Sequence, residues 1–184
     1  MTTNLWQGER IRLRGVEPED WQVFMDWNLD TETARACYFI PFPQSAADVK
    51  RYAEQTALQR GENDSYTLLM ALADGSVVGS INTHDAFRRY GTFSYGVAVK
   101  REYWGNGYAG EAIRLVLRYF FDELGYQKCN AGVYSFNTAS IRLHEKLGFT
   151  LEGRQRRNVF TNGEYFDNLL FGMTAEEFRA RWKE

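Results

Sequence analysis

The sequence predicts a single domain that mixes antiparallel β-strands with helices. Apolar and charged residues alternate near its start, and two dipeptides, Asp74-Gly75 and Asn162-Gly163, stand between strand-like runs as hairpin turns do. Between Gly107 and Leu124 apolar residues instead return every three or four positions, which is the period of a helix. With 184 residues the chain can bury a substantial core in one domain, so the expected fold class is α+β, over residues 1–184.

The first third of the chain is expected to hold a strand and two helices. Residues 10–15 alternate as a half-buried strand does. A helix follows to about Asn28, because Pro18 is tolerated in a first turn and acidic residues there favour the helix dipole. Ser45 is expected to cap a second helix that runs to about residue 60.

The middle of the chain reads as strands joined by tight turns. Residues 65–73 and 77–83 flank the Asp74-Gly75 turn as hairpin partners, and residues 92–99 form a third strand. This arrangement predicts a sheet that is mostly antiparallel.

The second half begins with the long amphipathic helix, for which Gly125 is a suitable terminating residue. A short strand over residues 129–134 follows, and Asn137 is expected to cap a helix that ends before Gly148. Residues 150–159 and 165–174 are then paired by the Asn162-Gly163 turn.

Composition excludes several classes of function. The net charge is −2, so the chain lacks a global basic field and no nucleic-acid partner is expected. The one basic cluster, Arg154, Arg156 and Arg157, is interpreted as a solvated turn or strand face, with a site for an anionic ligand as the alternative. Cys37 and Cys129 lie far apart and are expected to be buried or half-buried thiols rather than a disulfide. With two histidines and no clustered ligands, no metal site is expected, and without a long apolar run or a leader the expected location is cytoplasmic, with no membrane partner.

The most informative segment runs from Trp104 to Ala112, at the start of the long helix. Small residues there let a ligand approach the backbone. The N–H groups of a first helical turn, with the helix dipole behind them, form a site for phosphate oxygens.

Other interpretations of this segment are weaker. A nucleotide-binding Walker loop needs Lys and then Ser or Thr, whereas Glu111 and Ala112 stand here. Gly105, Gly107 and Gly110 do match the dinucleotide pattern G-x-G-x-x-G, but the next strand lacks the acidic residue that such a fold requires. A tight turn without a ligand is the remaining alternative.

The segment also resembles a known family. Trp104-Gly105-Asn106-Gly107-Tyr108-Ala109 is similar to the (Gln/Arg)-x-x-Gly-x-(Gly/Ala) motif of the GNAT superfamily of N-acetyltransferases, with Trp104 in place of Gln or Arg. Three further parts of the chain resemble the RimJ/RimL-like branch of this superfamily. They are residues 11–14 with Glu19-Asp20, residues 137–140 with residues 145–149, and residues 162–165 with Asp167. The resemblance covers about residues 7–175.

The resemblance implies a central sheet that splays around acetyl-CoA, flanked by helices. Backbone groups of Val97, Ala98 and Val99 would contact the pantetheine arm. The pyrophosphate would lie on the segment made of Trp104, Gly105, Asn106, Gly107, Tyr108, Ala109 and Gly110. Asn137 would lie near the pantetheine, and Lys146 could reach a phosphate, although a solvated helix residue is the favoured interpretation of Lys146.

The resemblance also points to a proton donor for the leaving thiolate. Many family members have a Tyr where this chain has His144, and RimL-like enzymes use a Ser that matches Ser140. These two residues are four apart on one helix and should share a face with Asn137. Ser140, His144 or a water between them is the expected donor, and the alternative is that His144 merely packs and Ser140 is only a hydroxyl group in the capping region of the helix.

The implied activity is transfer of an acetyl group from acetyl-CoA to a primary amine. The acceptor would be a protein N-terminal α-amine or a small molecule such as a polyamine or an amino sugar, and the absence of an acidic run argues mildly against polyamines. Tyr38, Phe39 and His84 are weak candidates for contacts with it. The alternative is a catalytically silent acyl-CoA-binding sensor, which the residue at position 144 would permit; a homodimer is a further expectation of the resemblance.

Overall fold

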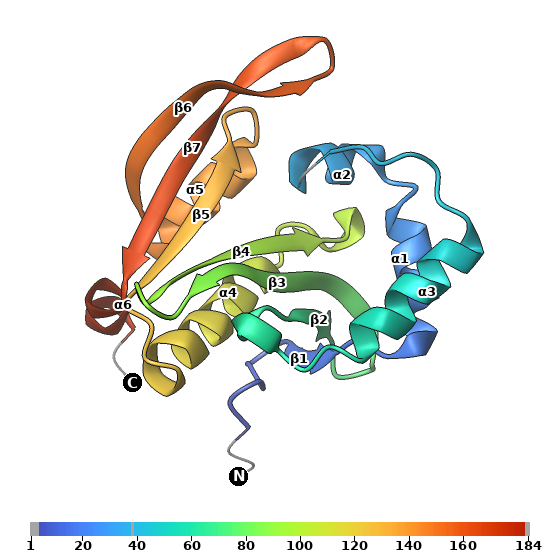
Figure 1. Ribbon diagram of the computed structural model, residues 1–184, viewed down its shortest axis with the longest axis horizontal. Coiled ribbons are helices and arrows are strands. Elements are labelled where there is room, and N and C mark those ends of the chain that lie inside the picture. Colours follow the sequence, from blue (N-terminus) through green and yellow to red (C-terminus); the bar gives the residue numbers. More distant parts are fainter. Residues whose placement is uncertain (1–3, 38, 183–184) are drawn as a thin grey trace. The chain divides into compact units, whose positions relative to one another are not determined.

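The computed structural model describes residues 4–37 and 39–182 of the chain (Figure 1). Within these residues seven strands are hydrogen-bonded in the order β1-β2-β3-β4-β5-β7-β6. The strands are β1 (Arg12–Gly15), β2 (Thr67–Ala71), β3 (Val77–Phe87), β4 (Thr92–Val99), β5 (Lys128–Tyr134), β6 (Thr150–Thr161) and β7 (Glu164–Thr174). The helices are α1 (Trp21–Trp27), α2 (Thr31–Cys37), α3 (Ala46–Ala57), α4 (Tyr108–Arg118), α5 (Thr138–Leu147) and α6 (Ala175–Arg181).

The pairing of the strands confirms the expected fold class. Strands β1 and β2, β2 and β3, β5 and β7, and β6 and β7 pair antiparallel, whereas β4 and β5 pair in parallel over their first residues. The chain forms two compact units. Unit 1 comprises Met1–His84 and Gly96–Leu115, and unit 2 comprises Asp85–Tyr95 and Val116–Glu184. Strand β4 therefore contributes its first half to unit 2 and its second half to unit 1.

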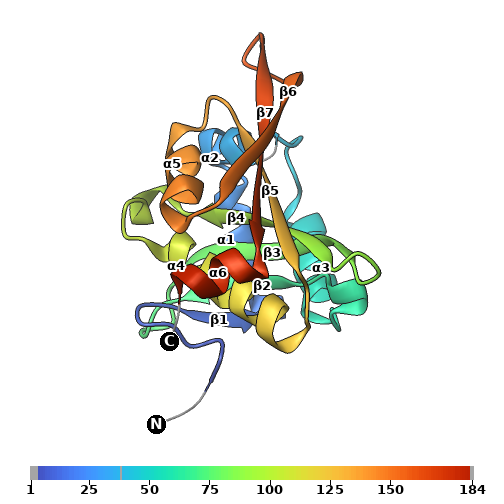
Figure 2. The ribbon, with the colours of Figure 1, turned by 90° about the vertical axis from the view of Figure 1, so that its left-hand side faces the viewer.

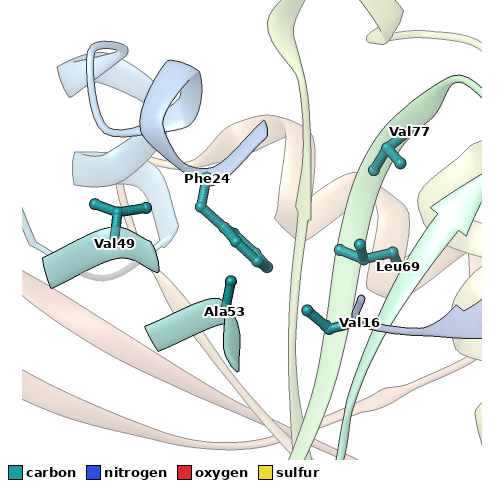
Figure 3. Packing of buried hydrophobic residues seen from close by; sticks show 6 residues of the cluster. All are labelled: Val16, Phe24, Val49, Ala53, Leu69 and Val77. Carbon is teal, nitrogen blue, oxygen red and sulfur yellow. The ribbon is translucent and has the colours of Figure 1, made fainter. Parts of the chain in front are cut away.

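Unit 1 has a core between one face of its strands and two helices. Ser45 caps α3 by accepting a hydrogen bond from the Asp48 amide, as expected. Figure 3 shows Phe24 of α1 reaching towards Ala53 of α3, with Leu69 of β2 on the other side. Burial of a large apolar side chain such as Phe24 stabilises a fold by roughly 1.5–3 kcal/mol. Burial of this kind holds α1 and α3 against the sheet.

Unit 2 has its own aromatic core and a long hairpin. The ring of Phe93 on β4 stacks on Phe120, with 4.0 Å between the ring centroids. Asn162 and Gly163 both have positive φ, as the predicted turn between β6 and β7 requires, and Figure 2 shows the hairpin as a long twisted ribbon. Strand β6 is the last in the strand order. Its register against β7 breaks between Gln155 and Val159, where Arg157 has a φ of 55°.

Several expectations about the elements need correction. Helices α2 and α6 were not expected, and the predicted helix over residues 107–124 ends its regular part at Arg118, where a wider turn, Tyr119–Glu123, follows. The predicted helix after β1 begins as a 3₁₀ turn over Pro18–Asp20. Cys129 is buried as expected, whereas Cys37, the last residue of the short helix α2, is exposed.

No helix within residues 4–37 and 39–182 is both long and apolar enough to cross a membrane. In the same residues, His, Cys, Asp and Glu side chains form no group of three or more that could hold a metal ion.

Candidate active site

The glycine segment joins the end of β4 to helix α4, as the sequence predicts. Gly105 and Gly107 have φ values of 80° and 79°, which residues with a side chain rarely adopt. Helix α4 then begins at Tyr108, and its first intrahelical hydrogen bond runs from the Glu111 amide to the Gly107 carbonyl. The amides before Glu111 have no partner inside the helix, and they are the donors that a phosphate group would use.

Arg10 braces this segment from the residues that precede β1. Its Nη1 donates to the carbonyl of Asn106 at 2.7 Å, and its Nε donates to the carboxylate of Glu111 at 3.0 Å. Glu111 also accepts from the Arg10 amide at 2.9 Å. The carboxylate that argued against a nucleotide loop is therefore buried and neutralised by a cation, rather than facing a ligand.

Two further side chains set the path of the segment. The indole Nε1 of Trp104 donates to the carbonyl of Val99 at 2.7 Å, and the side-chain Nδ2 of Asn106 donates to the carbonyl of Tyr103 at 3.0 Å. Trp104 thus has a structural task at the position where the family motif usually has Gln or Arg. The loop is tied to the end of β4 at one side and to Arg10 at the other.

The second half of β4 lies in unit 1, beside β3. Val97, Ala98 and Val99 are half-buried. Gly79 of β3 approaches this strand so closely that a Cβ there would lie 2.4 Å from the carbonyl oxygen of Ala98. The Sγ of Cys37, at the end of α2, lies 3.9 Å from the carbonyl oxygen of Val97.

Helix α2 is also held by the segment that follows β4. Arg101 donates to both carboxylate oxygens of Asp30 and pairs with Glu32. Asp30 in turn accepts from the Thr33 amide at 3.1 Å, which caps the helix. The Arg101 guanidinium holds the pKa of Asp30 far below its usual range, so this carboxylate stays ionised.

Helix α5, in unit 2, carries the candidate proton donor. Asn137 caps it by accepting from the Ser140 amide at 3.0 Å, and the Oγ of Ser140 lies 3.4 Å from Nδ1 of His144. These side chains share a face, as their spacing predicts. Ser140 is half-buried, whereas His144 is only 3% exposed.

The ring nitrogens of His144 both have partners. Nδ1 lies 2.8 Å from the carbonyl oxygen of Ser140, and Nε2 lies 2.8 Å from the hydroxyl of Tyr95 on β4. Since a carbonyl only accepts, Nδ1 carries the proton and Nε2 accepts from Tyr95. The rings of Phe149 and Phe171 lie within 5.5 Å of the His144 ring, centroid to centroid.

Burial sets the protonation states in this cluster. It lowers the pKa of His144 below its ordinary value, and the hydrogen bond to the Ser140 carbonyl opposes this only in part. Burial likewise raises the pKa of Tyr95 well above its ordinary value. At neutral pH the cluster is therefore an uncharged chain of hydrogen bonds.

The remaining predicted site residues lie elsewhere. Tyr38 is outside the described residues, and Phe39 is exposed between α2 and α3. His84 is exposed on β3, on the face that also presents Ser80 and Asn82. Lys146 is exposed on α5. Nothing in the structure tests whether these residues have a functional role, and the role proposed for each of them stays a prediction.

Unit 1 contains a pocket that the sequence analysis missed. Its volume is about 440 Å³, and it lies among α1, the segment before α3, α3, β2 and β3. It is lined by Phe24, Trp27, Asn28, Gln44, Val49, Tyr52, Thr67, Ser80 and Asn82. In the sequence, the aromatic residues of α1 indicate an apolar helix face but do not indicate a pocket. The pairing of Thr67 with Asn82 comes from strand register, which no local motif announces.

Comparison with known proteins agrees with this geometry. Residues 10–150 match the family described as the acetyltransferase (GNAT) domain. The chain is 46% identical, over 178 residues and 97% of each chain, to the SPbeta prophage-derived uncharacterized N-acetyltransferase YokL of Bacillus subtilis (strain 168). It is 25% identical to the putative ribosomal N-acetyltransferase YdaF of the same organism, covering 94% of this chain and 95% of that one.

Among solved structures, the spermidine N-acetyltransferase from Vibrio cholerae in complex with CoA and spermine has the same fold. It superposes with a TM-score of 0.81 at 19% identity, covering 93% of this chain and 99% of that one. The family match extends over most of the chain, and the sequence identity to a full-length N-acetyltransferase is high. The chain therefore belongs to the GNAT family of acetyltransferases and is an N-acetyltransferase.

Proposed function

We propose that the protein transfers an acetyl group from acetyl-CoA to a primary amine by direct attack of the amine on the thioester. The observation that carries this proposal is the glycine segment at the start of α4, where Gly105 and Gly107 have left-handed backbone angles and Arg10 braces the loop. Amide donors at a helix N-terminus suit the pyrophosphate of CoA. Membership of an N-acetyltransferase family supports the reaction type.

The reaction needs three groups from the protein or solvent. The attacking amine loses a proton as its nitrogen bonds to the thioester carbon, and the carbonyl oxygen gains negative charge. When the carbon–sulfur bond breaks, the thiolate takes up a proton and CoA leaves. Backbone N–H groups of Val97, Ala98 or Val99 are the proposed donors to the carbonyl oxygen, where fixed dipoles stabilise the transition state most.

Within the cluster on α5 the geometry favours Ser140 as the proton donor. Ser140 is half-buried, and its hydroxyl can both donate and accept. His144 is enclosed by aromatic rings, and both of its nitrogens are already bonded within unit 2. We therefore assign it a positioning task, which is to hold α5 and the Ser140 backbone. Asn137 would then act through its cap of the same helix.

The acceptor is proposed to be a protein N-terminal α-amine or a small-molecule amine. The relative named as a ribosomal N-acetyltransferase supports the first class, and the CoA-bound structural neighbour, which also holds spermine, supports the second. The RimJ/RimL-like branch, a cytoplasmic location, a homodimer and the extent of a single domain over residues 1–184 stay predictions.

The test combines binding with turnover. Acetyl-CoA is titrated calorimetrically, and thiol release is then followed with N-terminal peptides, polyamines and aminoglycosides. Binding with thiol release on one class supports the proposal. Binding without release on any amine favours the silent acyl-CoA sensor, and no binding refutes the cofactor assignment.

A matched pair of glycine variants isolates the loop. Gly105 and Gly125 have φ values of 80° and 73°, and neither has a neighbouring atom within 4 Å of the position of an added Cβ. Gly105→Ala and Gly125→Ala therefore carry similar backbone strain, roughly 1 kcal/mol. Only Gly105→Ala should weaken acetyl-CoA binding. Equal loss in the two variants would show that the effect comes from the fold and not from the loop.

A further inference from the structure

The pocket in unit 1 is large enough to hold part of a small acceptor. Its volume of about 440 Å³ lies in the range of roughly 300–1,000 Å³ that is usual for ligand sites. Phe24 and Val49 of its lining belong to the apolar cluster of Figure 3, so they supply a rigid apolar wall. The paired strands β2 and β3 contribute Thr67, Ser80 and Asn82 to the lining, and Thr67 is the register partner of Asn82.

The lining of the pocket carries hydrogen-bonding groups but no formal charge. It has three carboxamides and three hydroxyl groups, and none of the nine lining residues is Asp, Glu, Lys or Arg. The side-chain Nδ2 of Asn28 donates to Oε1 of Gln44 at 2.7 Å, and Nε2 of Gln44 donates to the Asp48 carboxylate at 3.1 Å. Asp48 lies outside the lining, and its charge is paired with Arg51.

The aromatic side chains of the pocket pack around Phe24. Phe24 meets Trp27 and Tyr52 edge to face, at 84° in each case, with ring centroids 5.6 and 5.3 Å apart. Trp27 and Tyr52 thus each pack against Phe24, and the three rings give the pocket an apolar aromatic wall.

The pocket adjoins the strand on which the acetyl group is expected to lie. The Oδ1 of Asn82 is 2.7 Å from the position that a Cβ of Gly96 would take, so this wall touches β4 directly. The next residue is Val97, the first of the three residues proposed to contact the cofactor. An amine that attacks beside Val97 can therefore place its substituent in the pocket.

We propose that this pocket selects acceptors in which the reacting amine carries an uncharged amide, hydroxyl or aromatic substituent, and that it disfavours acceptors with a second cationic group. The proposal rests on the proposed acetyl transfer. A second ammonium group would lose water on entering and would meet no carboxylate among the lining residues. Amide and hydroxyl groups of an acceptor would find matching partners there.

Four amines of similar length test this selection. 3-Aminopropanamide and 2-phenylethylamine carry uncharged substituents, putrescine carries a second cation, and n-butylamine is the apolar reference. The value of kcat/KM for the first two is expected to exceed that for putrescine by at least about tenfold, because a site built for neutral hydrogen-bonding groups rejects partners that leave charges unpaired. A value for putrescine equal to or above theirs would overturn the proposal.

A charge variant gives the reciprocal test. Asn82→Asp adds a carboxylate to the pocket wall without changing side-chain volume, whereas Asn158→Asp adds the same charge at an exposed position of β6 in unit 2. The ratio of kcat/KM for putrescine to that for 3-aminopropanamide should rise about tenfold in the first variant and stay within twofold in the second. An unchanged ratio in the first variant contradicts the proposal.

Binding to the pocket can be followed without turnover, which separates this proposal from the proposed function. Trp27 lines the pocket, and its indole N–H resonance can be assigned with Trp27→Phe. A saturable shift with 3-aminopropanamide but not with putrescine upholds the pocket, even if no amine is acetylated, in which case the proposed function fails. Acetylation of the neutral amines with no shift of Trp27 upholds the function and refutes the pocket.

Discussion

The Arg10 brace gives a quantitative prediction about cofactor binding. In Arg10→Ala the loop loses the hydrogen bond to the Asn106 carbonyl and the ion pair with Glu111. Because the Arg10 side chain is 52% exposed, the ion pair contributes only roughly 0–1 kcal/mol. The hydrogen bond from Arg10 to the Asn106 carbonyl is partly screened by solvent as well. Loss of both interactions should therefore weaken binding by about 1–2 kcal/mol, which is a factor of about 5–30 in affinity for CoA.

The fold should survive this change. Glu111 keeps its hydrogen bond from the backbone amide of residue 10, which does not depend on the side chain there, so its buried carboxylate retains a partner. The loss should therefore be confined to the loop that binds phosphate. Pantetheine, which lacks the phosphates and the adenosine of CoA, should bind the variant as it binds the wild type.

Calorimetric titration with the two ligands is the assay. For Arg10→Ala, a loss of about 1–2 kcal/mol should raise the Kd for CoA about 5- to 30-fold, while the Kd for pantetheine stays within twofold. Arg12→Ala, on the exposed side of β1, is the control and should change neither. Equal weakening for CoA and pantetheine, or an unchanged Kd for CoA, would refute the assignment of Arg10 to the phosphate loop.

Three further predictions concern α5 and α6. Ser140→Ala should lower kcat about 10²-fold with little change in the KM for acetyl-CoA, as loss of an acid catalyst does, and Thr138→Ala on the same helix should not; equal effects would discard Ser140 as the donor. Because the folded pKa of His144 is lowered, the unfolded chain takes up the proton first, so stability is full above about pH 6.5 and is lost as pH falls through the folded pKa. His144→Asn should flatten the fall in unfolding free energy between pH 7.5 and 5.5 in urea titrations, and an unchanged slope would show that another group titrates. Thr174→Ala removes the capping box with Glu177 and should cost about 1 kcal/mol, seen as a Tm lower by about 2–4 °C; no change would mean that α6 is held by packing alone.

Elements with local signals could be predicted from the sequence. Ser45 and Asn137 cap their helices through their own side chains, and Gly148 ends α5 with a φ of 94°. The turn at Asn162-Gly163 is set by two residues that tolerate positive φ. In each case the cause and the structure lie within a few residues of each other.

Features that depend on distant partners could not be predicted. Helix α2 is short and lacks an apolar stripe, and Arg101, far along the chain, holds its start through Asp30. The pair of Arg10 and Glu111 joins residues 101 positions apart. The spacing of Ser140 and His144 on one helix could be predicted, but the enclosure of His144 depends on Tyr95 of strand β4. The sequence alone therefore could not show which of the two residues donates a proton and which one only positions the other.

The exposed strand β6 has a consequence for how copies of the chain behave when crowded. A strand at the end of the order has backbone groups without a neighbouring strand, and such a row can recruit a strand from another molecule. Strand β6 is irregular between Gln155 and Val159, where its register against β7 shifts and Arg157 has a positive φ, and Arg156 and Arg157 place positive charges at this irregularity. If β6 of a second molecule approached this edge, it would meet an irregular backbone and like charges at the same point. The arginine cluster therefore disfavours aggregation through edge-to-edge pairing of β-strands.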